Sequence, residues 1–325
     1  MALNWVQYII LAVACAVSVM TTAHAQAYPK SQIKLIIPYP PGGATDRLGR
    51  QLAMGLGKRF GQILIVENRA GATGSIGIIA TVNAPPDGHT IVLGTGGTIA
   101  VDAVFEKLPY NPARDLVAVA PVASIPFVIV VNSAFPPRTI SELIALAKRE
   151  PGKINFASSG TGAPAHLTIE YLMALANIKM VHIPYKGATP AYNDVAGGQV
   201  QLLASDVASA LPLIQGGHLR PLAVSSAERV ALLPNVPTVA ESGLPGYEMG
   251  NWFGIFAPVK TPAEIVALLS KAINATVQEA EFKRGIEMLS AVSMVMTKPE
   301  FDRYIASETT RRVDLIKANN IVVER

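Results

Sequence analysis

Short apolar runs alternate along the chain with glycine-rich turns and with stretches of helical spacing. Residues 33–37 are apolar except for Lys34, include three isoleucines and stop at Pro38, which predicts a buried strand. After a turn at residues 40–43, Leu48, Leu52 and Leu56 recur at helical spacing across residues 44–60. Further strands are predicted at 63–66 and 90–93, and a helix at 74–82. Such repeated units predict a parallel, doubly wound α/β sheet.

The alternation continues through the second half of the chain. Strands are predicted at residues 127–131, 153–157, 180–183, 199–204, 219–224 and 253–256. Helices are predicted at 139–149, 164–176, 262–279 and 299–319, with Thr139 or Ser141 capping the first. Because no low-complexity linker separates the halves, we expect two lobes that are joined by crossing strands.

The first residues have the pattern of an export signal. Residues 5–20 are almost continuously apolar and are followed by small residues up to Ala25, which predicts a signal peptide of residues 1–25. A second cleavage site ends at Ala27. No Lys or Arg precedes Lys30, so an uncleaved anchor is the alternative. The single cysteine, Cys15, lies inside this segment, and the processed chain would hold neither a disulfide nor a thiol nucleophile.

Composition and charge narrow the classes of partner. The chain has 325 residues, half of them apolar and 15% charged, which suits a large core in two packed units. The net charge is +4, without a basic run, aromatic–basic interleaving or zinc-ligand spacing. Nucleic acid is therefore not expected as a partner, and no metal or cofactor is expected. A mildly basic surface suits an anionic ligand.

Three glycine-containing loops are the candidate anion sites: residues 40–46, 94–98 and 158–166. In a parallel sheet, ligands bind beyond the carboxyl ends of the strands, where helix starts offer unpaired N–H groups. A single loop of this form is equally well read as a tight turn. Three in one two-lobe chain favour a ligand with one or two carboxylates.

Seven blocks of sequence resemble the receptor proteins of tripartite tricarboxylate transporters, also called Bug proteins. They occur in family order from about residue 28 to the C-terminus, at residues 39–46 (YPPGGATD), 66–74 (VENRAGATG), 86–90 (PDGHT), 151–155 (PGKIN), 182–187 (HIPYKG), 234–238 (PNVPT) and 241–247 (ESGLPGY). Two positions depart from the family pattern. Pro41 stands where alanine is commoner, and Ser205 precedes Asp206 where an aromatic residue is usual.

The resemblance implies a periplasmic venus-flytrap fold of type II-like topology, with a ligand cleft between two α/β lobes. Residues 28–123 and 247–325 would form lobe 1, and residues 124–246 would form lobe 2. It also implies a non-enzymatic, monomeric receptor that binds a small carboxylate or amino-acid-like ligand and passes it to membrane permease subunits. The implied ligand-binding residues are Tyr39, Pro40, Gly42, Gly43, Ala44, Asp46, Thr98, Ser158, Ser159, Gly160, Thr161, His166, Tyr185 and Asp206.

Several of these residues have structural interpretations. Asp46 suits the positive end of a helix dipole, and Ser158, Ser159 and Thr161 suit helix caps. Ser159, His166 and Asp206 also contain the residue types of a hydrolase triad, which makes a secreted α/β hydrolase the alternative of another class. The Gly-x-Ser-x-Gly elbow and the Gly-x-Gly-x-x-Gly dinucleotide fingerprint are both absent. A receptor that feeds a signalling partner is a third interpretation.

Overall fold

Ten strands form one mixed sheet with the order β2-β1-β3-β9-β4-β7-β5-β6, and β8 and β10 also pair with β4. The computed structural model describes residues 28–101 and 108–319, so the predicted signal peptide and Cys15 lie outside the described residues. Residues from Gln32 onward form one unit, to which the following applies. The strands are β1 (Lys34–Ile37), β2 (Ile65–Asn68), β3 (Thr90–Thr95), β4 (Leu116–Asn132), β5 (Asn155–Ser158), β6 (Val181–Pro184), β7 (Leu202–Asp206), β8 (Leu219–Val224), β9 (Gly250–Pro258) and β10 (Val292–Ser293).

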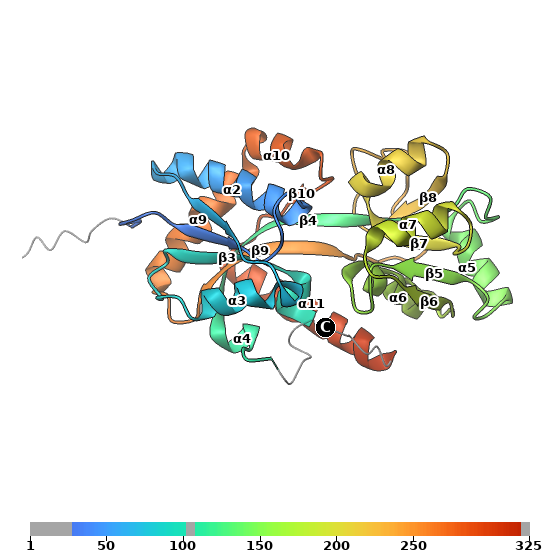
Figure 1. Cartoon of the computed structure of the whole chain (residues 1–325), viewed down its shortest axis with the longest axis horizontal. Helices are drawn as coiled ribbons and strands as arrows, with labels where there is room; N and C mark the ends of the chain where they lie inside the picture. Colours follow the sequence, from blue (N-terminus) through green and yellow to red (C-terminus); the bar gives the residue numbers. More distant parts are fainter. Residues whose placement is uncertain (1–27, 102–107, 320–325) are drawn as a thin grey trace, which may run out of the picture. The chain divides into compact units, whose positions relative to one another are not determined.

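Helices cover both faces of the sheet (Figure 1). They are α2 (Ala44–Phe60), the 3-10 turn η2 (Ala72–Gly74), α3 (Ser75–Val82), the π-helical turn η3 (Gly97–Val101), α4 (Pro112–Asp115), α5 (Ile140–Arg149), α6 (Pro164–Ala176), α7 (Ala188–Ala196), α8 (Val207–Gln215), α9 (Ala263–Gln278), α10 (Ala280–Glu287) and α11 (Lys298–Ala318). The predicted helices 44–60 and 164–176 have the predicted bounds, and Thr139 caps α5 through the N–H of Glu142.

The parallel sheet predicted from residues 33–98 is confirmed for β1, β2 and β3, but the sheet as a whole is mixed. β1 pairs in parallel with β2 and β3, and β5 does so with β6 and β7. In contrast, β9 is antiparallel to β3 and β4, and β4 is antiparallel to β7 and β8. A strand that is buried on both faces has a continuous apolar pattern whether its neighbours run parallel or antiparallel to it. The sequence of such a strand therefore does not show the direction of pairing.

One strand, β4, serves two parts of the sheet. Its residues 116–126 pair with β9, and its residues 127–132 pair with β7 and β8. We call β1, β2, β3, β9 and the start of β4 the first half-sheet, and β5–β8 with the end of β4 the second half-sheet. Only residues 127–131 were predicted as a strand, whereas β4 begins at Leu116 and contains Pro121 and Pro126, a residue type that is uncommon inside strands. The pairing of β4 with β9 absorbs two register shifts, near Ala118 and Pro121.

Each half-sheet has its own apolar core. Trp252, Phe256 and Phe301 pack together in the first, with Trp252 edge-on to Phe301 at 6.2 Å between centroids. Phe156, Leu167 and other buried residues of β5 and α6 fill the second. In the part of the chain that the structure describes, no helix combines the length and the apolar character needed to cross a membrane.

A buried ion pair ties α11 to β9. Arg312 and Glu308 are both at least 97% shielded from solvent, and their nearest atoms are 3.0 Å apart. Arg312 also donates to the carbonyl oxygen of Gly250 at 2.8 Å. Burial lowers the pKa of Arg312 to about 10, with a smaller effect of neighbouring Arg311, so the guanidinium stays charged at neutral pH.

Candidate ligand-binding site

The loops at the carboxyl ends of β1, β2 and β3 meet, as the parallel arrangement predicts. The Tyr39 hydroxyl lies 3.2 Å from the Thr95 hydroxyl, which links the loop after β1 to the loop after β3. Gly74 packs against both loops, since a Cβ there would lie 2.7 Å from Thr98 Cγ2 and 3.4 Å from the Tyr39 ring. The Thr98 hydroxyl is buried and bonds to the backbone and side chain of Thr95. Thr98 therefore shapes this loop.

Asp46 organises the loop of residues 40–46. It is 3% exposed and accepts hydrogen bonds from the Gly42 N–H at 2.9 Å, Arg50 Nε at 2.9 Å and Asn68 Nδ2 at 2.8 Å. Burial alone would raise the pKa of Asp46, but these hydrogen bonds outweigh it and lower the pKa to about 2. Because its charge is already balanced, Asp46 positions the loop, and Gly42, with φ +87, allows the turn.

The helix that follows this loop begins without a side-chain cap. The N-cap of α2 is Gly43, in an extended conformation, so the N–H groups of the first turn, beginning at Ala44, are left without a side-chain acceptor. Pro40 and Gly43 are both exposed. The first loop thus presents the backbone donors that the sequence predicted.

In the second half-sheet, a stack of histidines underlies the loop after β5. The rings of His166 and His182 are stacked with centroids 3.8 Å apart. His182 Nε2 lies 2.7 Å from Ser158 Oγ, which in turn accepts from the Gly160 N–H at 3.2 Å. His166 Nδ1 accepts from the Gly162 N–H, so its Nε2 donates to Glu170, at 3.1 Å. These bonds hold the backbone of residues 158–162 in place.

Tyr185 braces the same loop from β6. Its N–H donates to the Ser158 carbonyl at 3.0 Å, and its hydroxyl donates to Asp194 at 2.5 Å. The hydrogen bond to Asp194, with burial, raises the pKa of Tyr185 to about 12. Tyr185 therefore orders the loop with a hydroxyl that is already occupied.

A cavity of about 180 Å³ opens beside this loop. Its polar lining consists of Ser158, Ser159, Tyr192, Ser205, Asp206 and Asn251. The predicted residues Ser158, Ser159 and Asp206 are thus brought together, whereas Gly160, Thr161, His166 and Tyr185 surround the cavity without lining it. The predicted residues of the first half-sheet do not line it either; they gather with one another at the ends of β1–β3.

Tyr192, Ser205 and Asn251 are lining residues that sequence reasoning missed. Tyr192 lies on α7, which begins after Gly187 and repeats the strand–glycine–helix pattern used elsewhere. That signal was available in the sequence. Asn251 reaches the cavity only because β9 lies beside β4 in the sheet, and no local pattern indicates this.

Comparisons with known proteins agree with this architecture. Residues 48–321 match the family described as the tripartite tricarboxylate transporter family receptor. Protein BugT of Bordetella pertussis is 35% identical over 295 residues, which cover 90% of each chain. The chain belongs to this receptor family.

Solved structures resemble the receptor over nearly its whole length. The R. palustris protein Rpa4515 with adipate is 31% identical, with a TM-score of 0.76, covering 91% of the receptor and 99% of that chain. MatC from Rhodopseudomonas palustris with bound malate is 29% identical, with a TM-score of 0.70, covering 89% and 100%. Related solved structures of similar identity are periplasmic binding proteins. The predicted two-lobe α/β solute-binding fold is confirmed.

The geometry does not assemble the hydrolase triad of the alternative interpretation. Both ring nitrogens of His166 are engaged, by the Gly162 N–H and by Glu170, so neither reaches Ser159. Ser159 is exposed, while Ser158, which does contact a histidine, is 2% exposed. The described residues contain no cluster of three His, Cys, Asp or Glu suited to a metal.

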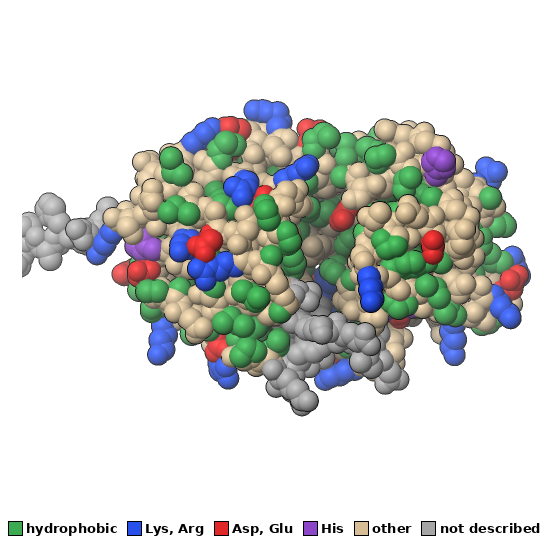
Figure 2. All heavy atoms as spheres, in the orientation of Figure 1, with side chains coloured by type: hydrophobic (Ala, Val, Ile, Leu, Met, Phe, Trp, Pro, Cys, Tyr) green, Lys and Arg blue, Asp and Glu red, His purple; other side chains and the backbone are tan. Residues whose placement is uncertain are grey.

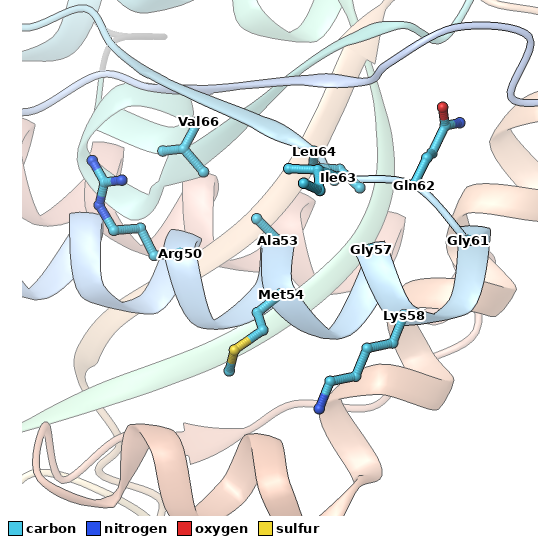
Figure 3. A pocket seen from close by; sticks show the side chains of 10 residues that line it. All are labelled: Arg50, Ala53, Met54, Gly57, Lys58, Gly61, Gln62, Ile63, Leu64 and Val66. Carbon is cyan, nitrogen blue, oxygen red and sulfur yellow. The ribbon is translucent and has the colours of Figure 1, made fainter.

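A larger cavity of about 570 Å³ lies on the receptor at α2 and residues 61–66, and none of the predicted ligand-binding residues lines it. Figure 3 shows that Ala53, Met54 and Ile63 give it an apolar lining between Arg50 and Lys58. Both cations are already paired, Arg50 with Asp46 and Lys58 with Glu281. On the face drawn in Figure 2, basic and acidic side chains are interspersed.

The stacked pair of His166 and His182 makes the receptor's stability depend on pH. Burial, with a smaller effect of His166, lowers the pKa of His182 from 6.5 to about 4. Between these values the unfolded chain binds more protons than the folded one, so stability falls as the pH is lowered from 6.5 towards 4. We expect His182→Gln, which can still bond Ser158, to flatten the fall in melting temperature over this range. His218→Gln, at an exposed histidine, is the control. If the melting temperature falls with pH equally steeply in the wild type and in His182→Gln, the expectation is wrong.

Proposed function

We propose that this receptor works in the periplasm, where it captures a small organic carboxylate between its two lobes and delivers it to a membrane permease, without chemical change. The observation that carries the proposal is that α2 and α6, one on each half-sheet, begin without side-chain caps after the short loops that follow β1 and β5. Because α6 opens with Pro164, which has no N–H, its free donors begin at Ala165. A helix start supplies N–H donors and a positive dipole end, which suit carboxylate oxygens. The relatives with adipate and with malate support this ligand class.

The proposed mechanism is lobe closure. A ligand that touches the loop of residues 40–46 and the loop of residues 158–166 binds the closed form better and shifts the population towards it. We assign residues 28–123 and 247–325 to lobe 1 and residues 124–246 to lobe 2. The change in pairing of β4 between Pro126 and Phe127 supports a division close to these bounds. We further propose that the closed monomer is recognised by the permease subunits, with no nucleic-acid partner.

The test is a melting-temperature screen of the protein purified from the periplasm of an expression host. N-terminal sequencing of that sample determines whether the chain is cleaved after Ala25, cleaved after Ala27 or left uncleaved. A carboxylate at 100 times its dissociation constant should add about 2.7 kcal/mol of stability. Recovery of the ligand unchanged supports a receptor, while turnover of it, or no shift with any mono-, di- or tricarboxylate, would contradict the proposal.

Ser159→Ala should weaken binding of the ligand found in that screen about tenfold, since a hydrogen bond to a charged group contributes roughly 1.5–3 kcal/mol. The hydroxyl is exposed at the cavity, so the melting temperature of the free protein should not change. Isothermal titration measures the affinity. Ser307→Ala, an exposed serine on α11, is the matched control, and equal affinities for the two variants would remove Ser159 from the site.

A further inference from the structure

The small cavity beside the loop after β5 has one formally charged lining residue, Asp206, and no Lys or Arg among its lining residues. Its volume of about 180 Å³ corresponds to roughly six water molecules at about 30 Å³ each, enough for one end of a small ligand. A cavity for a simple carboxylate would be expected to carry donors or a cation and no anion. This cavity offers the Ser159 hydroxyl as a donor, but it also carries the Asp206 carboxylate.

The Asp206 carboxylate lacks a counter-charge. None of the described residues forms a hydrogen bond or ion pair with its side chain, although it is half-buried at the start of α8. The other shielded carboxylates have partners: Asp46 has Arg50, Glu170 has His166, and Glu308 has Arg312. Asp206 is thus a half-buried charge that is open towards the cavity.

Two hydroxyl groups that line the cavity with Asp206, those of Ser205 and Tyr192, do not neutralise it. Ser205 Oγ donates to the backbone carbonyl of Asp206 at 2.9 Å, which uses its only proton. The Tyr192 hydroxyl lies 2.5 Å from Ser205 Oγ and donates to it. The hydroxyl protons of Ser205 and Tyr192 are therefore both used in these two hydrogen bonds, and neither is donated to the Asp206 carboxylate.

A second acceptor without a donor lies in the same cavity. Asn251 Oδ1 is shielded from solvent and has no hydrogen-bond partner among the described residues. It comes from β9, whereas Asp206 comes from β7, so the two acceptors reach the cavity from different strands. A buried acceptor left without a donor costs about 1–3 kcal/mol, and a ligand with several N–H donors would recover that cost.

We propose that the ligand of this receptor is an amino carboxylate, whose protonated amine lies between Asp206 and Asn251. An ammonium group brings three N–H donors and one positive charge, matching the two free acceptors and the single negative charge. A dicarboxylate without an amine would instead bring a second anion to Asp206. This inference rests on the proposed function and narrows its ligand class.

The experiment compares acids that differ only by an amino group: succinate with aspartate, glutarate with glutamate, adipate with 2-aminoadipate, and butyrate with 4-aminobutyrate. Isothermal titration of the wild-type protein at pH 7.5 should find at least one pair in which the amine-bearing acid binds tenfold or more tightly. Asp206→Asn should remove that preference, and Asn251→Ala should reduce it. Asp314→Asn, an exposed carboxylate on α11, should leave it unchanged.

The outcomes separate this inference from the proposed function. If the amine-free acids bind as tightly or more tightly, or if Asp206→Asn keeps the preference while its melting temperature shows it folded, the amino-carboxylate assignment is wrong and the carboxylate receptor stands. Binding of an amine-free acid that tightens as the pH falls would assign Asp206 a donating role as a protonated acid, which also overturns the inference. If no acid of either kind binds, both proposals fail.

Discussion

Glu308→Gln is expected to be the most destabilising of the substitutions considered, at about 3–5 kcal/mol, because removing one partner of a buried ion pair strands the other charge. Arg312 would remain charged in a fully buried position, with the Gly250 carbonyl and an amide oxygen as its acceptors. Arg311, which also contacts Glu308, is partly exposed and can turn to water. Urea unfolding at pH 7 measures the loss.

Two further variants separate the charge from its surroundings. Asp314→Asn removes a carboxylate charge from an exposed position of the same helix and should change stability little. The double change Glu308→Leu with Arg312→Met removes both charges at once and should recover part of the loss, since apolar replacements of buried pairs are often tolerated. A Glu308→Gln variant no less stable than Asp314→Asn would show that the buried pair is not needed for stability.

The largest loss of binding is expected for Gly43→Leu, at least about 100-fold, which is roughly 2.7 kcal/mol. The backbone at Gly43 is extended, with φ −74 and ψ 173, a conformation that any residue adopts. A Cβ there would meet nothing closer than the Pro40 carbonyl oxygen at 3.9 Å. The fold should therefore tolerate the side chain, while its bulk would cover the N–H groups at the start of α2.

A size series at this position is the control. Gly43→Ala adds one methyl group and should bind more tightly than Gly43→Leu. Gly43→Ser adds an N-cap hydroxyl that accepts from the same N–H groups, so it should bind more weakly than Gly43→Ala. Titration with the ligand found for the wild type gives the affinities, and melting temperatures confirm that each variant is folded. Wild-type affinity in Gly43→Leu would mean that the start of α2 does not hold the ligand.

Local sequence patterns predicted well those features that depend on local physics. The loops at residues 40–46 and 158–166, the bounds of α2 and α6, and the cap at Thr139 follow from glycine, apolar spacing and capping chemistry. The pairing of Asp46 with Arg50, one helical turn away, was not predicted, although it too depends on local spacing. The bond from Asn68 to Asp46 does not, since it depends on where β2 lies.

What could not be predicted depends on the order of strands. Nothing near Asn251 distinguishes it from any polar residue at the start of a strand, and it becomes a cavity residue because β9 pairs with β4 as far as Pro126. Residues 116–126 were not predicted as a strand for a similar reason: their strand conformation depends on pairing with β9. Two prolines are tolerated in β4 because the register shifts around them, a property of the pair of strands rather than of either sequence.

The position of β9 also affects how the protein is made. β9 lies between β3 and β4, yet it is synthesised about 150 residues after β3. During translation the earlier strands therefore wait, with an open edge, until almost the whole second half-sheet has left the ribosome. Pairing across such a separation closes a long loop and is slow, which leaves the nascent chain time to meet chaperones before it folds.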